Sequence, residues 1–294
     1  MDIGFAGAGR MGRPMIRNLV AAGHAVSVFD PYVDVATAFP PGSVRAVVAP
    51  AELTASPLSI SMLPDAAATE QVLIESGLLQ AAPPGHCHVV MGTTGPRAVA
   101  ALADAALANG VALVDAPVSG SVAAAESASL VTMVGADSEV FAWILPVLAA
   151  MTSSQFHVGP SGSGATAKLA VNLVIGAVNQ ALAEALLLAE GAGLGRGVLY
   201  DVLENSAAGS TYVRAKRAAF LAPDATPVAA PVSLMAKDMA LVLELAREHG
   251  RVLPGASATA EALRAACAAG HDGLDMAQVL LSLRAESLIG DAVA

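Results

Sequence analysis

The sequence opens with a short apolar run and a glycine-rich segment, DIGFAGAGRMG at Asp2–Gly12, and this stretch decides the fold. Residues 2–6 are typical of a buried strand, and the apolar spacing over residues 11–22 indicates a helix. Between them, Gly7, Gly9 and Gly12 have the spacing G-x-G-x-x-G. In this setting the first glycine permits a tight turn, the second lets a backbone approach a diphosphate, and the third allows close packing of helix on strand.

A second strand is predicted at residues 25–29, and it is followed directly by Asp30. An acidic residue about this far beyond the first glycine accepts hydrogen bonds from ribose hydroxyls. This order of elements predicts a dinucleotide-binding domain of the Rossmann type: a strand, a glycine turn, a helix and a second strand that ends in an acidic residue. The carboxylate favours NAD because it would repel the 2′-phosphate of NADP. NADP stays open as an alternative, since Arg10 or Arg45 could meet that phosphate.

Alternating strand and helix patterns continue to about residue 160. Further strands are predicted at 58–62, 88–91, 112–114, 131–134 and 155–158, with helices such as 66–80 and 97–109 between them. This alternation indicates a mostly parallel sheet covered by helices. The sequence GPSGSG at residues 159–164 then indicates a domain boundary.

Only helical patterns follow, at 165–191, 196–205, 210–221, 232–249, 255–269 and 276–288. The predicted fold class is thus an α/β Rossmann-type N-terminal domain (residues 1–160), a long linking helix and an all-α C-terminal domain (residues 161–294). We expect the second domain to serve substrate binding and oligomerisation.

The composition, with 55% hydrophobic and 14% charged residues and a mean hydropathy of +0.63, first suggests a membrane protein. We find no run of about 20 apolar residues, however, and alanine supplies much of the apolar share. A net charge of −10 argues against a nucleic-acid partner. Two cysteines and an N-terminus without a basic, apolar leader lead us to expect a cytoplasmic protein with no membrane partner.

His86-Cys87-His88 is the one short cluster of residue types that bind metals. Because no third group of ligands accompanies it, we interpret it as a solvated loop and predict no metal site. Cofactor and substrate chemistry must then come from other residues.

Lys168 and Asn172 lie four residues apart and so share one face of the predicted helix 165–191, which is otherwise mostly apolar. Polar groups on such a face line a cleft or meet buried partners. The chain has only three lysines, Lys168, Lys216 and Lys237. Arginine keeps its proton in proteins, whereas burial lowers the pKa of a lysine and allows it to exchange one. A lysine on such a face is therefore suited to accept or donate a proton.

The glycine segment continues through Arg13-Pro14-Met15, Asn18-Leu19 and Gly23-His24, and it resembles the β-hydroxyacid dehydrogenases. The resemblance is greatest to 3-hydroxyisobutyrate dehydrogenase and its tartronate semialdehyde, succinate semialdehyde and glyoxylate reductase relatives. It covers nearly the whole chain. Further family motifs follow in the expected order: Met62-Leu63-Pro64, Thr93-Thr94-Gly95-Pro96, DAPVSG at 115–120, GATAKLAVN at 164–172, and Lys237-Asp238.

The resemblance implies hydride transfer between NAD and a small, 3-hydroxyisobutyrate-like β-hydroxy acid, with Lys168 as proton donor or acceptor. It places the substrate carboxylate at Ser119, Gly120 and Asn172, in a site between the two domains. The implied cofactor contacts are Gly7, Gly9, Arg10, Met11, Gly12, Asp30, Met62, Leu63, Pro64, Thr93 and Lys237. Together with the Ala-rich helices of the second half, the resemblance leads us to expect a homodimer or homotetramer.

Two alternatives remain. One is an NADPH-dependent reductase of a small semialdehyde, glyoxylate or imine, although imine-reducing relatives often carry Asp or Tyr where this chain has Lys168. The other is a dinucleotide sensor without turnover, which would be expected to lack Lys168 or Asn172. The chain also departs from the family at glycine positions occupied by Ser121, Ala124, Ala128 and Ala136, and at a serine position occupied by Gly92. These departures leave the identity of the substrate open.

Overall fold

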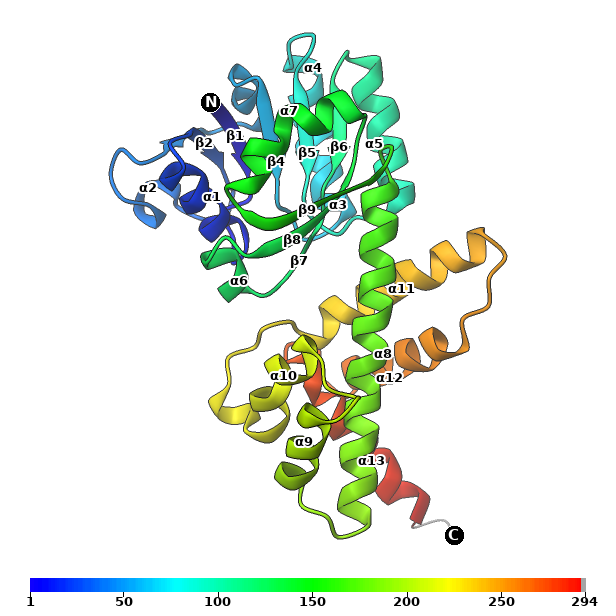
Figure 1. The fold of residues 1–294 in the computed structure, drawn as a ribbon. Coiled ribbons are helices and arrows are strands. Elements are labelled where there is room, and N and C mark those ends of the chain that lie inside the picture. Colours follow the sequence, from blue (N-terminus) through cyan, green and yellow to red (C-terminus); the bar gives the residue numbers. More distant parts are fainter. Residues whose placement is uncertain (292–294) are drawn as a thin grey trace. The chain divides into compact units, whose positions relative to one another are not determined.

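The computed structural model describes the backbone of residues 1–291 and the side chains of residues 1–285. The chain forms two compact units, Met1–Lys168 and a second that starts at Leu169. Helix α8 (Ser163–Gly191) begins in the first unit and continues as one helix into the second (Figure 1). Because α8 belongs to both units, the domain boundary after residue 160 stays a prediction.

The first unit contains one twisted sheet in the order β3-β2-β1-β4-β5-β6-β8-β7, with β9 paired to β8. Neighbouring strands from β3 to β6 are parallel, whereas β8 runs antiparallel to β6 and β7. This confirms the predicted, mostly parallel sheet. The strands are β1 (Asp2–Ala6), β2 (Ala25–Phe29), β3 (Arg45–Ala46), β4 (Leu58–Ser61), β5 (Cys87–Val90), β6 (Ala112–Asp115), β7 (Val118–Ser119), β8 (Leu130–Gly135) and β9 (Thr152–Gly159).

Helices cover both faces of this sheet (Figure 1). They are α1 (Gly12–Ala21), α2 (Val35–Ala38), η1 (Pro50–Ala55), α3 (Ala66–Glu70), η2 (Gln71–Glu75), α4 (Leu78–Ala81), α5 (Pro96–Ala108), α6 (Val122–Glu126) and α7 (Ser138–Ala149). The single helix predicted over residues 66–80 is wrong: α3 continues into a π-helical turn, η2, and the left-handed Gly77 (φ 77°) separates both from α4.

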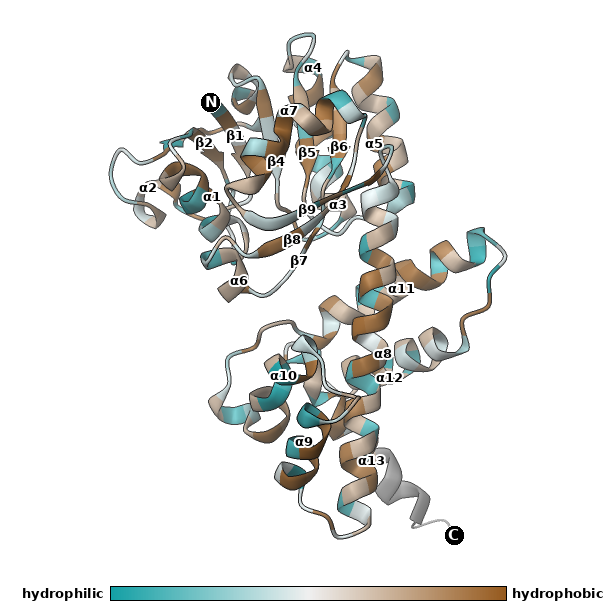
Figure 2. Cartoon of the chain, viewed as in Figure 1, coloured by the Kyte–Doolittle hydropathy of each residue, from teal (hydrophilic) through white to brown (hydrophobic). Residues whose placement is uncertain are grey.

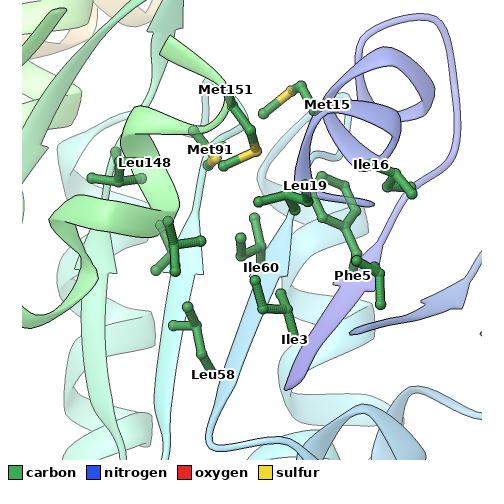
Figure 3. Packing of buried hydrophobic residues seen from close by; sticks show 14 of the residues in the cluster. Ile3, Phe5, Met15, Ile16, Leu19, Leu58, Ile60, Met91, Leu148 and Met151 are labelled. Atoms are coloured by element: carbon green, nitrogen blue, oxygen red, sulfur yellow. The ribbon is translucent and has the colours of Figure 1, made fainter. Parts of the chain in front are cut away.

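The main core of this unit lies where α1 packs on β1 and β4 (Figure 3). Ile3 and Phe5 of β1 and Ile60 of β4 are fully buried against Met15 and Leu19 of α1. Each such side chain contributes about 1.5–3 kcal/mol through burial. This packing of β1 and β4 against α1 fixes the position of the turn that joins β1 to α1.

The second unit is helical throughout its described part, in agreement with the prediction. It contains the remainder of α8, α9 (Arg196–Asn205), α10 (Thr211–Leu221), η3 (Pro223–Ala225), α11 (Val232–Glu248), α12 (Pro254–Ala268), η4 (Met276–Gln278) and α13 (Val279–Asp291). Its core gathers buried side chains from α8 to α13, including Leu186, Tyr200, Phe220, Met239 and Leu263.

By length and composition, α8 could cross a membrane, with a mean hydropathy of 1.6 in its most apolar window (Figure 2). The expectation that no segment would be apolar enough is therefore wrong for this helix. The core helix of a globular protein passes the same test. In α8, 39% of that window is buried, and Asn172 and Asn179 are buried there and hydrogen-bonded within the second unit.

Candidate functional site

The candidate cofactor segments of the first unit follow neighbouring parallel strands. Gly7 follows β1, Met62 follows β4 and Met91 follows β5; the Met62 amide donates to Ala6 (2.9 Å) and the Met91 amide to Ser61 (2.8 Å). The carboxyl ends of these strands therefore meet at one edge of the sheet. Dinucleotides bind at this edge in doubly wound folds.

Glycines allow the loops at this edge to pack backbone against backbone. Gly7 has φ +99°, and a Cβ there would collide with the carbonyl oxygen of Met62. A Cβ on Gly92 would collide with the carbonyl oxygen of Leu63, and one on Gly12 with that of Gly7. The backbone of Leu63 therefore leaves no room for a side chain at residue 92.

Gly9 differs from these glycines because its missing side chain leaves open space. It is exposed, and a Cβ there would have no neighbour within 4 Å. Arg10 beside it is also exposed, and Met11 is half-buried. The turn before α1 thus presents bare backbone to an approaching group, as binding of a diphosphate requires.

Asp30 lies at the end of β2, and its carboxylate joins β2 to the glycine turn. Oδ2 accepts from the Ala8 amide (2.7 Å), while Oδ1 accepts from the amides of Tyr32 (2.8 Å) and Val33 (2.9 Å). A carboxylate has about four acceptor positions. The bonds to backbone fix its orientation and leave capacity for a hydroxyl group.

The two loops predicted to contact the cofactor lie at the same edge. Met62, Leu63 and Thr93 are half-buried, and Pro64 is exposed. Beside Thr93, the hydroxyl of Thr94 is buried and has no hydrogen-bond partner among the described residues. Sequence reasoning named Thr93 in this segment and missed the buried hydroxyl next to it.

The predicted carboxylate-binding segment follows β6. Ser119 is half-buried on β7, and Gly120 is exposed with φ +140°. A Cβ on Gly120 would lie 2.7 Å from Leu130 Cδ2 and 3.0 Å from Ala124 Cβ. The positive φ and these contacts therefore favour glycine at 120. Its backbone amide and the Ser119 hydroxyl are hydrogen-bond donors suited to a carboxylate.

Lys168 is half-buried on α8, one turn before Asn172. In the second unit, Asn172 Nδ2 donates to Asp238 Oδ2 (2.7 Å), and Lys237 Nζ lies 3.2 Å from Asp238 Oδ1. The fold thus brings together Asn172 of α8 and the Lys237-Asp238 pair of α11, which are far apart in sequence.

Asp115, the last residue of β6, is a further polar group that sequence reasoning did not assign. It is 1% exposed, and it accepts hydrogen bonds from the amides of Gly162 (2.7 Å) and Ala165 (2.6 Å). Desolvation raises the pKa of its carboxyl to about 6, against the opposing effect of these backbone donors. The signal in the sequence is an acidic residue ending an apolar strand, directly before Ala116-Pro117.

The solvated loop predicted at His86-Cys87-His88 is wrong, because all three residues are buried. Ser59 Oγ lies 2.7 Å from both His86 Nε2 and His88 Nδ1, and His88 Nε2 lies 3.0 Å from Ser61 Oγ. The serines of β4 face the imidazoles across the sheet, and the pattern of β5 alone does not reveal such partners. No cluster of three potential metal ligands occurs among the described residues.

Comparison with known proteins gives matches over both halves of the chain. Residues 2–159 match the family described as the NAD binding domain of 6-phosphogluconate dehydrogenase. Residues 162–283 match the family described as NAD-binding of NADP-dependent 3-hydroxyisobutyrate dehydrogenase.

Individual proteins are similar along nearly their full length. The chain is 35% identical to 3-hydroxyisobutyrate dehydrogenase of Pseudomonas aeruginosa, over 95% of this chain and 97% of that protein. It is 32% identical to 2-(hydroxymethyl)glutarate dehydrogenase of Eubacterium barkeri, over 95% and 94%. A solved structure of Mycobacterium tuberculosis 3-hydroxyisobutyrate dehydrogenase with L-serine has a TM-score of 0.81 and 30% identity, covering 96% of this chain and 99% of that one.

Proposed function

The chain belongs to the β-hydroxyacid dehydrogenase family, and from this membership we propose that it transfers a hydride between NAD and a small β-hydroxy acid similar to 3-hydroxyisobutyrate. It is an oxidoreductase acting on a CH–OH group. The main support for the proposal is that the candidate cofactor segments of the first unit lie at one edge of its sheet. Lys168 lies on α8, the helix that follows the last strand of this sheet.

A bound nicotinamide cofactor supplies the hydride acceptor for alcohol oxidation. The open backbone at Gly9 fits such a group, and so does the Thr94 hydroxyl, which has no partner within the described part of the chain. We assign the diphosphate to Gly7, Gly9 and Gly12, and the adenosine ribose to Asp30. The remaining proposed cofactor contacts are Arg10, Met11, Met62, Leu63, Pro64, Thr93 and Lys237.

Asp30 makes NAD the favoured form, because its charge repels a 2′-phosphate. The second candidate function, an NADPH-dependent reductase of a small semialdehyde or glyoxylate, has one observation in its favour: the family matching residues 162–283 is described with NADP. Initial rates with NAD and NADP, and with their reduced forms, separate the two. A strong preference for NADP would overturn the role given to Asp30.

The substrate carboxylate is assigned to the Ser119 hydroxyl, the Gly120 amide and the Asn172 amide. Lys168 is the proposed proton acceptor and donor. In oxidation its neutral Nζ accepts the hydroxyl proton of the substrate while the hydride leaves carbon; in carbonyl reduction the ammonium returns that proton to oxygen. A panel of 3-hydroxyisobutyrate, 3-hydroxypropionate, serine and glycerate, followed by NADH absorbance, identifies the acid.

The role of Lys168 is tested with Lys168→Ala and Lys168→Arg. Arginine keeps the positive charge but cannot release a proton, so both variants should lose turnover while NADH binding, measured by fluorescence, persists. The control is Lys216→Arg, since Lys216 pairs with Asp275 rather than with a proposed site residue. Full activity in Lys168→Ala would overturn the mechanism.

For assembly and location we propose a cytoplasmic homodimer or homotetramer without nucleic-acid or membrane partners. The proposal is supported by the apolar, Ala-rich helices of the second half and by the acidic net charge of −10. Light scattering coupled to size exclusion gives the mass directly. A monomer across the micromolar range would contradict the proposed assembly.

A further inference from the structure

The carboxylate of Asp115 joins the end of a central strand to the start of the helix that carries Lys168. It lies at the carboxyl end of β6. It accepts hydrogen bonds from Gly162 N (2.7 Å), just before α8, and from Ala165 N (2.6 Å), in the first turn of α8. These partners are 47 and 50 residues away in sequence. All of these residues belong to the first unit.

The surroundings of this carboxylate are shaped by two glycines. A Cβ on Gly164 would lie 2.6 Å from the Asp115 carbonyl oxygen and 3.0 Å from Oδ2. A Cβ on Gly135, at the end of β8, would collide with Oδ1. Strands β6 and β8 and helix α8 therefore close around Asp115, and only residues without a side chain fit beside it.

This arrangement connects two parts of the proposed chemistry. Lys168 lies three residues after Ala165, so it follows within one helical turn of the bonded amide. Ser119 and Gly120 follow Asp115 by four and five residues along the chain. One buried carboxylate thus fixes the first turn of α8 against the strand that leads to the carboxylate-binding segment.

We propose that Asp115 is a positioning residue, which sets the placement of Lys168 relative to Ser119 and Gly120 by holding the first turn of α8 with its carboxylate. This inference rests on the proposed function. A negative charge at a helix N-terminus is favoured by the unpaired amides and the helix dipole. An asparagine of the same size would direct its NH₂ group at one of those amides, so one bond is lost and the helix start shifts.

The test compares Asp115→Asn with Asp34→Asn. Asp34 also caps a helix, since its Oδ1 accepts from Ala36 N (3.1 Å) at the start of α2, but it is remote in sequence from α8. The concentration of folded protein is measured by NADH-binding stoichiometry. A misplacement of about 1 Å can cost on the order of 100-fold in rate. We expect kcat per NADH site to fall 10- to 100-fold in Asp115→Asn and to stay at the wild-type value in Asp34→Asn, with the NADH affinity of both unchanged.

A double-variant cycle separates positioning from plain destabilisation. If Asp115 acts through Lys168, Asp115→Asn will not lower the residual rate of Lys168→Ala any further. An equal loss in both backgrounds, or a kcat per site within twofold of wild type, overturns the proposal. Should Asp115→Asn not fold, Asp115→Ser keeps one acceptor and is read by the same criteria. Loss of turnover in Lys168→Ala alone tests the proposed function separately.

Discussion

Asn172 and Asp238 form a hydrogen bond of 2.7 Å between Nδ2 and Oδ2, and both residues are almost completely buried. The bond joins α8 to α11 inside the second unit. A carboxylate can only accept, so one N–H of Asn172 Nδ2 is directed at Asp238, and the second N–H is the donor that remains for the proposed substrate carboxylate. The orientation of a proposed substrate-binding group is therefore set by a residue 66 positions later in the chain.

Replacing Asp238 should weaken binding of the hydroxy acid. In Asp238→Ala the buried Asn172 amide loses its acceptor, which costs about 1–3 kcal/mol of unfolding free energy, and the amide is free to rotate. We expect KM for the acid to rise several-fold more than KM for NAD. Asp238→Asn retains an acceptor oxygen and should show a smaller rise. Steady-state kinetics measure both effects, and unchanged KM values in Asp238→Ala would contradict the role of this bond.

Removing one partner of the buried ion pair between Lys216 and Asp275 should strongly destabilise the second unit. Nζ lies 2.6 Å from Oδ1, and the carboxylate also accepts from the amides of Ala229, Ala230 and Ala277. Lys216→Met leaves a buried charge unpaired, so we expect a loss of about 3–5 kcal/mol in urea unfolding.

A matched control for this pair is the exposed bridge between Arg217 and Asp201. Asp201→Asn should cost less than about 1 kcal/mol, because solvent screens exposed pairs. Adding Asp275→Asn to Lys216→Met should recover part of the loss by removing the unpaired charge. If Lys216→Met and Asp201→Asn lowered the unfolding free energy by the same amount, the burial of Lys216 would have no effect on the cost of breaking its ion pair.

The sequence predicts those features whose information is local. The glycine spacing from Gly7 to Gly12, the acid at Asp30 and the apolar runs of the main strands are each complete within a short window. The short strands β3 and β7 were not predicted, because two residues carry no alternation.

Features that depend on distant partners could not be predicted. The role of Asp115 depends on amides near residue 165, and the burial of His88 depends on Ser59 and Ser61 of another strand. Nothing in either local pattern reports those contacts. The packing of Gly92 is of the same kind, since it depends on the backbone of Leu63.

The buried imidazoles should make stability depend on pH. Desolvation, with a smaller effect of His86, lowers the pKa of His88 to about 3 from its ordinary value of 6.5, and desolvation also lowers that of His86. The unfolded chain therefore binds protons at a higher pH than the folded one. Stability from His88 is complete above pH 6.5 and is lost as the pH falls toward 3.

Urea unfolding of wild type and His88→Gln between pH 4 and pH 8 isolates this effect. Glutamine can bond to both serines but does not titrate, so wild type should lose roughly 3 kcal/mol relative to the variant by pH 4. Asp115, whose pKa is raised, acts in the opposite direction, because its folded form binds a proton first as the pH falls below about 6. Asp115 is present in both proteins, so its effect cancels in the difference between their unfolding free energies. A difference that stays constant with pH would contradict the buried neutral imidazole.

Ala128 has a backbone conformation that favours glycine, with φ +52°, and it is the only described residue other than glycine with positive φ. It occupies a position where the resembling family has glycine. Left-handed backbone costs an L-residue about 1–2 kcal/mol, which exceeds the entropic cost of about 0.5–1 kcal/mol for introducing glycine. Ala128→Gly should therefore raise the unfolding free energy by about 0.5–1 kcal/mol.

The control is Ala123→Gly, an exposed position inside α6. There glycine should destabilise by about 1 kcal/mol, because the helix gains nothing from left-handed freedom. The two substitutions are chemically identical and lie five residues apart, so the sign of the effect depends on backbone conformation alone. Thermal and urea unfolding measure it, and destabilisation by both glycines would show that Ala128 is not strained.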